Sequence, residues 1–201
     1  MRQATVVGVH RRKTTGVTRR DPKREAYGDL VERQFTPEAP NKLWVADVTQ
    51  HQTAEGWLYL AVIIDAYSRL VVGWAMNERF TAELVLSALE MALRNRQPEE
   101  GVIHHSDHGS QYTSLSFGQR LEQAGVWGSM GRVGDALDNA VAESFFASLQ
   151  TELLNRYAWP TRQRLRSAIF EFIEVFYNRQ RWHSTLRYLT PVEFGRLSRS
   201  T

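Results

Sequence analysis

A short and nearly continuous apolar segment, residues 57–64 (WLYLAVII), most limits the folds open to this chain. The segment is far shorter than the roughly 20 residues needed to span a bilayer. Turn residues enclose it, with Glu55 and Gly56 before it and residues 66–69 after Asp65. A short apolar run bounded by turns is typical of a strand buried on both faces. We therefore expect a sheet whose central strand covers residues 57–65.

The segments on either side predict further strands and helices. Residues 43–49 alternate, which places Val45, Asp47 and Thr49 on one face of a strand and Trp44, Ala46 and Val48 on the other. The remaining expected strands are residues 70–76, 102–105 and 125–130, and the expected helices are residues 81–96, 116–123, 138–154 and 162–179, with Thr81, Asp138 and Thr161 as N-cap candidates. This order predicts an α/β protein, with an antiparallel meander joined to short parallel strands and flanking helices. It is the ribonuclease H-like order.

Charge is distributed unevenly and divides the chain into three parts. Nine Lys and Arg stand against five Asp and Glu in residues 1–38, eight against fourteen in residues 39–160, and eight against three in residues 161–201. We expect a basic arm at 1–40, a core domain at 41–160 and a basic helical extension at 161–201. Basic arms commonly contact a polyanion, although solvated helices give the same pattern.

The composition excludes several classes of site. The chain has no cysteine, so it cannot form a disulfide framework, a thiolate nucleophile, an iron–sulfur cluster or a cysteine-based zinc finger. Its N-terminus leads directly into charged residues, and no apolar run approaches the length of a membrane span. The sequence therefore predicts a cytoplasmic protein without a membrane partner.

Three carboxylates occupy positions from which they can converge. Asp47 lies in the first strand, Asp107 follows the strand at 102–105, and Glu143 lies early in the helix at 138–154. Taken singly, each has a structural explanation. Asp47 can be a hydrogen-bonded strand residue, Asp107 can be a turn residue, and Glu143 can interact favourably with the helix dipole. Taken together, they form a set of hard oxygen ligands suited to Mg²⁺ or Mn²⁺. Two such ions roughly 4 Å apart catalyse in-line displacement at a phosphodiester.

The histidines beside Asp107 suggest a zinc site, which we consider less plausible. His104, His105 and His108 fall within five residues of a strand and the loop that follows. Alternation along the strand sends His104 and His105 to opposite faces. Three imidazoles so placed cannot all reach one ion.

Six motifs follow one another along the chain: residues 44–49 (WVADVT), 56–65 (GWLYLAVIID), 104–112 (HHSDHGSQY), 138–144 (DNAVAES), 176–179 (FYNR) and 183–186 (HSTL). In this order they closely resemble the motifs of the integrase-type transposases of bacterial insertion sequences, namely the second-frame product of the IS-three family. The resemblance covers about residues 30–197. The family's acidic triad, with 35 residues between its second and third members, falls on Asp47, Asp107 and Glu143.

The resemblance implies a function and partners. The expected enzyme is a polynucleotidyl transferase with a ribonuclease H-like core and two Mg²⁺ ions, which Mn²⁺ can replace. It is expected to cut and join double-stranded DNA at the element ends and the target, as a homo-oligomer associated with the nucleoid. Asn139 takes a supporting role beside Glu143, whereas Asp65, at the end of a buried strand, is more simply structural.

Departures from the family pattern affect DNA contacts more than chemistry. His108 and Gln150 stand where the family commonly has basic residues, and residues 1–13 resemble only the tail of the helix-turn-helix segment that precedes this core in relatives. That segment is expected to be absent, or supplied by a first-frame partner. Candidate DNA-contacting positions are Arg11, Arg12, Lys13, Arg19, Arg20, Arg132, Gln150, Arg179 and Arg181.

Two other functions stay open at the level of sequence. One is a truncated, noncatalytic DNA-binding fragment that regulates or inhibits full-length transposase, which Gln150 and the short N-terminus favour. The other is a metal nuclease that hydrolyses DNA or RNA without joining strands. The intact carboxylates at Asp47, Asp107 and Glu143 favour the transposase.

Overall fold

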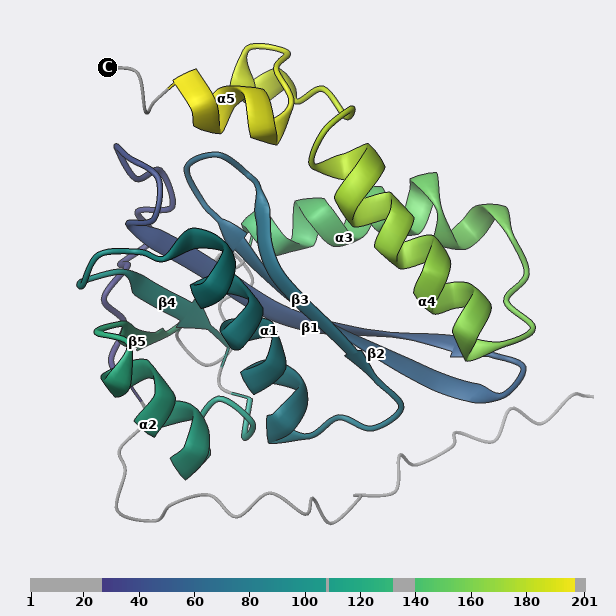
Figure 1. The fold of residues 1–201 in the computed structure, drawn as a ribbon, viewed down its shortest axis with the longest axis horizontal. Coiled ribbons are helices and arrows are strands. Elements are labelled where there is room, and N and C mark those ends of the chain that lie inside the picture. The colour runs from purple at the N-terminus through teal and green to yellow at the C-terminus, as the bar shows by residue number, and fades with distance from the viewer. Residues whose placement is uncertain (1–26, 108, 132–139, 198–201) are drawn as a thin grey trace, which may run out of the picture.

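A computed structural model describes residues 27–107, 109–131 and 140–197, which form one mixed sheet with helices on both faces (Figure 1). The sheet has five strands in the order β3-β2-β1-β4-β5. The strands are β1 (Leu43–Thr53), β2 (Gly56–Asp65), β3 (Val71–Asn77), β4 (Ile103–Ser106) and β5 (Trp127–Met130). β1, β2 and β3 pair antiparallel, and β4 pairs parallel with both β1 and β5. The meander followed by short parallel strands is therefore confirmed.

The helices cover the sheet in two layers, with α1 and α2 on one face and α3 and α4 on the other (Figure 1). Their bounds are α1 (Ala82–Arg96), α2 (Leu115–Gln123), α3 (Ala140–Glu152), α4 (Arg162–Glu171) and α5 (Pro191–Leu197). A π-helix, η3 (Phe172–Tyr177), continues α4, and short 3-10 turns are η2 (Leu154–Arg156) and η4 (Ser184–Leu186). None of the helices in these ranges is long and apolar enough to cross a membrane.

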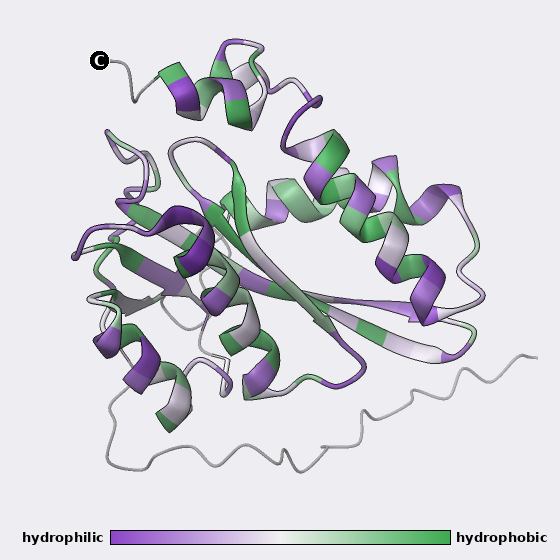
Figure 2. Ribbon diagram, viewed as in Figure 1, coloured by the Kyte–Doolittle hydropathy of each residue, from purple (hydrophilic) through white to green (hydrophobic). Residues whose placement is uncertain are grey.

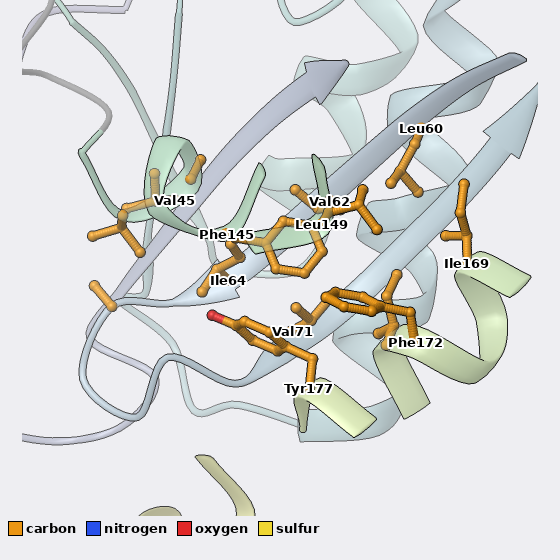
Figure 3. Packing of buried hydrophobic residues seen from close by; sticks show 14 of the residues in the cluster. Val45, Leu60, Val62, Ile64, Val71, Phe145, Leu149, Ile169, Phe172 and Tyr177 are labelled. Atoms are coloured by element: carbon orange, nitrogen blue, oxygen red, sulfur yellow. The ribbon is translucent and has the colours of Figure 1, made fainter. Parts of the chain in front are cut away.

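β2 is the strand buried on both faces, as its apolar sequence predicts. Val62 and Ile64 belong to the core beneath α3 and α4, which Figure 3 shows with Phe145 and Phe172 packed against them. The alternate residues, among them Ile63, belong to the core beneath α1 and α2. Figure 2 shows apolar colour along the central strands and alternating polar and apolar bands on the helices. Two separate apolar cores therefore hold the central strands in place.

A glycine in β3 permits the close approach of α1. A Cβ atom at Gly73 would lie 2.3 Å from the carbonyl oxygen of Ala88 and 2.7 Å from the backbone nitrogen of Ala92. Both contacts are shorter than real Cβ atoms make, and both are to helix backbone that cannot rotate away. The sheet and α1 can pack at this distance only because the residue has no side chain.

The C-terminal part of the chain differs from the expectation in two ways. The helix predicted at 162–179 is α-helical only to Glu171 and then widens into η3, and the sequence analysis did not predict α5. A capping box begins α5: Glu193 N–H donates to Thr190 Oγ1 at 3.2 Å, and Thr190 N–H donates to Glu193 Oε2 at 2.9 Å. The motif Thr190-Pro191 with Glu193 is therefore the sequence signal for the start of α5.

Residues beyond 160 share the hydrophobic core of the sheet. Leu165, Ile169 and Tyr177 pack in the same cluster as Phe145 of α3. Asn178 then fixes the edge strand β3, since its Oδ1 accepts from Val71 N–H at 3.0 Å and its Nδ2 donates to the Val71 carbonyl at 3.1 Å. Residues 165–178, which the sequence assigns to a C-terminal extension, thus pack against the sheet and α3.

The structure also differs from the sequence-based expectation at the end of β1 and at the N-cap of α1. β1 extends to Thr53, four residues past the predicted end, because it forms a long hairpin with β2 that closes at Gly56. Thr81 occupies the N-cap position of α1, but its side chain makes no capping hydrogen bond. Asp138 lies outside the described residues.

Candidate active site

Asp47 lies in β1 at the point where the pairing with β4 ends. The last paired residues are Ala46 in β1 and Ser106 in β4, so Asp47 and Asp107 are the next residues along two parallel neighbours. Adjacent strands lie about 4.8 Å apart. Parallel pairing therefore brings these two carboxylates to the same end of the sheet, although 59 residues separate them in sequence.

Local hydrogen bonds orient both aspartates. Asp47 is half-buried, and its Oδ1 accepts from the N–H of Val48 at 2.7 Å. Asp107 is exposed, and its Oδ1 accepts from the N–H of Gly109 at 3.1 Å. The carbonyl of Gly109 in turn accepts from the N–H of Tyr112 at 3.1 Å. The loop after β4 is thus a hydrogen-bonded turn that begins at the Asp107 carboxylate.

Glu143 comes from the first turn of α3, on a different face of that helix from the core residues. Ala142, Phe145 and Leu149 are buried, whereas Glu143 and Gln150 are exposed. Glu143 therefore lies on the solvent side of α3, directly after the buried Ala142. An acidic residue in the first turn is also favoured by the helix dipole.

The three carboxylates interact electrostatically. Burial raises the pKa of Asp47 to about 6, the hydrogen bond from Val48 opposes this rise, and the negative charges of Asp107 and Glu143 raise the pKa further. The structure therefore brings the predicted residues close enough for charge coupling. Within residues 27–107, 109–131 and 140–197, however, no three acidic or histidine side chains lie close enough together to hold a metal ion.

The donor chemistry nonetheless fits a divalent cation. Asp47 and Asp107 present carboxylate oxygens, the ligands that Mg²⁺ and Mn²⁺ prefer. Burial raises the pKa of Asp47, and the like charges of Asp107 and Glu143 add to the rise. A bound cation would stabilise the ionised form of that carboxylate.

Tyr112, which was not among the predicted site residues, lies within the electrostatic influence of Asp47 and Asp107. It lies five residues after Asp107, is 2% exposed, and its hydroxyl has no hydrogen-bond partner among the residues that the structure describes. Burial raises the pKa of the Tyr112 phenol well above its ordinary value, and the charges of Asp47 and Asp107 add to the rise. The sequence signal that could have identified Tyr112 is its position at the end of the turn that begins at Asp107.

The histidine positions argue against zinc in the described part of the chain. His104 packs against Phe117 at 5.2 Å between ring centroids, in the core beneath α2, whereas His105 packs against Phe35 at 5.4 Å on the other face. Burial lowers the pKa of His104 to about 4, which keeps its ring neutral. The expected alternation of these two residues is therefore confirmed. His108 lies outside the described residues.

The buried aspartate at the end of β2 has structural partners. Asp65 is fully buried, accepts from the Ser68 hydroxyl at 2.8 Å, and lies 3.7 Å from the Arg96 guanidinium. These contacts join the β2–β3 turn to the end of α1. They match the structural interpretation of Asp65.

The predicted DNA-contacting residues that the structure describes already have contacts within the chain. Arg181 forms an ion pair with Glu152 at 3.0 Å, Arg179 donates from Nε to the Glu174 carbonyl at 2.9 Å, and the Gln150 amide donates to Asn155. The other predicted positions, Arg11, Arg12, Lys13, Arg19, Arg20, Arg132 and the supporting Asn139, lie outside the described residues.

A separate groove of about 1070 Å³ lies between the end of α3 and the α4–η3 helix, and none of the three carboxylates lines it. Its walls include the exposed rings of Tyr157 and Trp182, the partly buried Trp159, and the paired residues Glu152 and Arg181. The groove is thus distinct from the carboxylate site.

Comparisons with known proteins agree with this arrangement. Two family models described as integrase core domain match residues 37–136 and 143–198. The HTLV-2 integrase catalytic core domain in complex with magnesium has a TM-score of 0.57 at 18% identity, covering 79% of this chain and 98% of that one. A chain of the simian T-cell lymphotropic virus intasome has a TM-score of 0.66 at 16% identity, covering 88% of this chain and 60% of that one. The expected ribonuclease H-like fold is therefore confirmed.

Relatives in sequence come from insertion elements. A 31 kDa protein of insertion element IS600 from Shigella sonnei is 49% identical over 83% of this chain and 61% of its own length. The transposase of IS904 from Lactococcus lactis and the transposase InsF of IS3A from Escherichia coli are each 43% identical over 83% of this chain, and over 66% and 58% of their own lengths. This chain thus spans about three fifths of the length of these relatives. It belongs to the integrase core family, as a member of the insertion-sequence transposases of the IS-three type.

Proposed function

We propose that this chain is the catalytic core of a DNA transposase, a polynucleotidyl transferase that cuts a DNA strand and joins the exposed 3′-hydroxyl to a second phosphodiester. The observation that carries the proposal is the parallel pairing of β1 and β4, which places Asp47 and Asp107 next to each other at the point where the pairing ends. Burial raises the pKa of Asp47, and the charges of Asp107 and Glu143 add to the rise. Like charges kept close together cost free energy unless the site serves to gather positive charge.

The residues that would hold a divalent ion are Asp47 and Asp107, with Glu143 completing the set from α3. We propose two Mg²⁺ ions, which Mn²⁺ can replace; the magnesium present in the HTLV-2 integrase core supports this choice. When bound, the ions supply positive charge to the attacking and leaving oxygens of an in-line displacement. We assign Asn139 a supporting role beside Glu143.

The chain's own residues set the geometry of this site. The Val48 N–H directs one oxygen of Asp47, which leaves the other oxygen available to a ligand. The Gly109 N–H does the same for Asp107. Glu143 is exposed on a helix whose buried face is fixed by Phe145 and Leu149, so its side chain can approach the two aspartates without disturbing the core. Positioning of this kind, without a covalent enzyme intermediate, suits phosphoryl transfer.

We propose double-stranded DNA, both element ends and target, as the substrate, and a homo-oligomer as the working form, because two DNA ends have to be joined in one complex. The basic residues of the arm, with Arg132, Gln150, Arg179 and Arg181, are the candidate DNA contacts. A first-frame partner is proposed to supply sequence-specific recognition. Phosphate contacts alone give binding that is strong at low salt and carries little sequence information.

A strand-transfer assay tests the proposal. The parent and an Asp107→Asn variant are incubated with Mg²⁺ or Mn²⁺, a supercoiled plasmid, and labelled duplexes taken from the DNA that flanks the gene. The proposal expects joined products, longer than the labelled strand, from the parent alone. Only shorter products would indicate a nuclease, and DNA binding without any new product would indicate a noncatalytic regulatory fragment.

A further inference from the structure

Among the described residues, the hydroxyl of Tyr112 is a buried polar group without a hydrogen-bond partner, carried by the turn that begins at Asp107. The residue is 2% exposed, and no described group accepts or donates a hydrogen bond at its oxygen. An unsatisfied buried hydroxyl destabilises the folded state, and phenylalanine would fill the same space without that penalty. The cost points to a use for the hydroxyl in a state of the site that this structure does not show.

The ring of Tyr112 is held firmly. It packs edge-on against Phe117 at 5.4 Å between centroids and lies 5.9 Å from the ring of His104. The backbone N–H of Tyr112 donates to the Gly109 carbonyl, which closes the turn that begins at Asp107. Ring packing and this backbone hydrogen bond therefore fix the position of the residue that carries the hydroxyl.

The same turn places this ring beside the Asp107 carboxylate. A Cβ atom added at Gly109 would lie 3.0 Å from Asp107 Oδ1 and 3.3 Å from Tyr112 Cδ2, so the carboxylate and the ring flank one glycine. The negative charges of Asp47 and Asp107 both act on the phenol. A carboxylate is the strongest hydrogen-bond acceptor that this region offers.

The alternative acceptor is Nε2 of His104, which is itself buried and without a partner in the described chain. The Tyr112 hydroxyl and His104 Nε2 do not form a hydrogen bond with each other, because both atoms are without a partner in the described chain. A small shift that joined them would make Tyr112 a purely structural residue. This alternative predicts a different outcome in the experiment below.

We propose that Tyr112 is a positioning residue of the active site, whose hydroxyl donates a hydrogen bond to the carboxylate of Asp107 when Asp47 and Asp107 hold a divalent cation. The ring of Tyr112 packs in the core beneath α1 and α2, whereas Glu143 lies on α3, which covers the other face of the sheet. A hydrogen bond to a metal-binding carboxylate fixes its orientation, and removal of such outer partners typically lowers metal affinity 10- to 100-fold. The inference rests on the proposed metal-dependent function.

The test measures Mn²⁺ affinity of the full chain by electron paramagnetic resonance, together with stability to urea in EDTA. The Tyr112→Phe variant is expected to bind Mn²⁺ at least tenfold more weakly than the parent while its stability in EDTA is equal or higher. Tyr177→Phe is the matched control, because its phenol is also buried but is influenced by Arg69, Arg181 and Glu152 rather than by the aspartates. Its Mn²⁺ affinity is expected to be unchanged.

The Asp107→Asn variant separates failure of this inference from failure of the proposed function. If Asp107→Asn loses Mn²⁺ binding but Tyr112→Phe binds within twofold of the parent, the metal site stands and the role of Tyr112 is refuted. Lower stability of Tyr112→Phe in EDTA with unchanged Mn²⁺ affinity would likewise refute it, in favour of a bond to His104. If the parent and Asp107→Asn bind Mn²⁺ equally, both proposals fail.

A second measurement needs no stable variant. Tyrosine labelled with ¹³C at Cζ reports the hydrogen bond of each phenol by nuclear magnetic resonance. Addition of Mg²⁺ is expected to move the Tyr112 signal and to leave the Tyr177 signal in place. A Tyr112 signal that does not respond to saturating Mg²⁺ would overturn the inference.

Discussion

Neutralising Asp47 should stabilise the metal-free protein, although it should destroy the proposed activity. Asp47 combines partial burial with two like-charged neighbours, and these raise its pKa from 3.8 to about 6. The folded state therefore binds the Asp47 proton more tightly than the unfolded state does. Stability is favoured below pH 4, falls as the pH rises from about 4 through 6, and is constant above that window.

The magnitude follows from the shift. A difference of roughly 2 pKa units corresponds to about 3 kcal/mol at 1.36 kcal/mol per unit. Partial exposure and screening of the charge pairs reduce this figure, so we expect a gain of about 1–3 kcal/mol for Asp47→Asn at pH 8. Asparagine keeps the shape and can still accept from the Val48 N–H, which lies 2.7 Å from Oδ1 in the parent. The difference from the parent should shrink below about 1 kcal/mol near pH 4.

Urea unfolding in EDTA, followed by tryptophan fluorescence at pH 8 and pH 4, measures this difference. Asp107→Asn and Glu143→Gln are the matched controls: burial is the first cause of the Asp47 shift, so removing one neighbouring charge should stabilise less than Asp47→Asn does. Saturating Mg²⁺ should stabilise the parent but not Asp47→Asn. An Asp47→Asn protein that is no more stable than the parent in EDTA at pH 8 would refute the reasoning.

Three further predictions concern packing and DNA contact. Gly73→Ala should destabilise the fold by at least roughly 2 kcal/mol in urea unfolding, since its Cβ would meet α1 backbone at 2.3 Å; equal stability would show that α1 can shift freely. Asn178→Ala should cost roughly 2–4 kcal/mol in the same assay, because the buried N–H and carbonyl of Val71 lose their partner; a loss under 1 kcal/mol would contradict this. Gln150→Lys should steepen the salt dependence of DNA binding by about one unit in a filter-binding titration, whereas an unchanged slope would place DNA elsewhere.

The sheet could be predicted from sequence because its signals are local. The apolar run at β2 and the alternation in β1 specify strands buried on defined faces, and both appear where expected. The C-terminal helices were harder to predict. The hydrophobic period of residues 162–179 does not distinguish an α-helix from one that widens at Phe172, because the π-helix keeps Phe172, Ile173 and Tyr177 on the buried side.

In the candidate site, too, some features can be predicted from the sequence and others depend on the tertiary structure. The carboxylates are visible in the sequence because charged residues interrupt or follow strands, and the spacing matches a known family. The environment of Tyr112 is not visible, since the burial of its hydroxyl depends on packing against Phe117 in a different element. The internal contacts of Gln150 and Arg181 also depend on the tertiary structure and could not be inferred from helix periodicity.

The unequal lengths of two neighbouring strands explain how Asp47 can be half-buried and still open to solvent on one side. β1 continues to Thr53, but its ladder with the short strand β4 ends at Ala46, one residue before Asp47. On its other edge, β1 stays paired with β2, where Asp47 lies opposite Val62. The backbone of Asp47 is therefore fixed by its pairing with β2, and the residue lies next to the apolar core. Because β4 ends here, the other side of Asp47 is open to Asp107 and to solvent. Had β4 been longer, its backbone would have covered this opening. Had it paired antiparallel, the chain would have left β4 at the opposite end of the sheet and carried Asp107 away from Asp47.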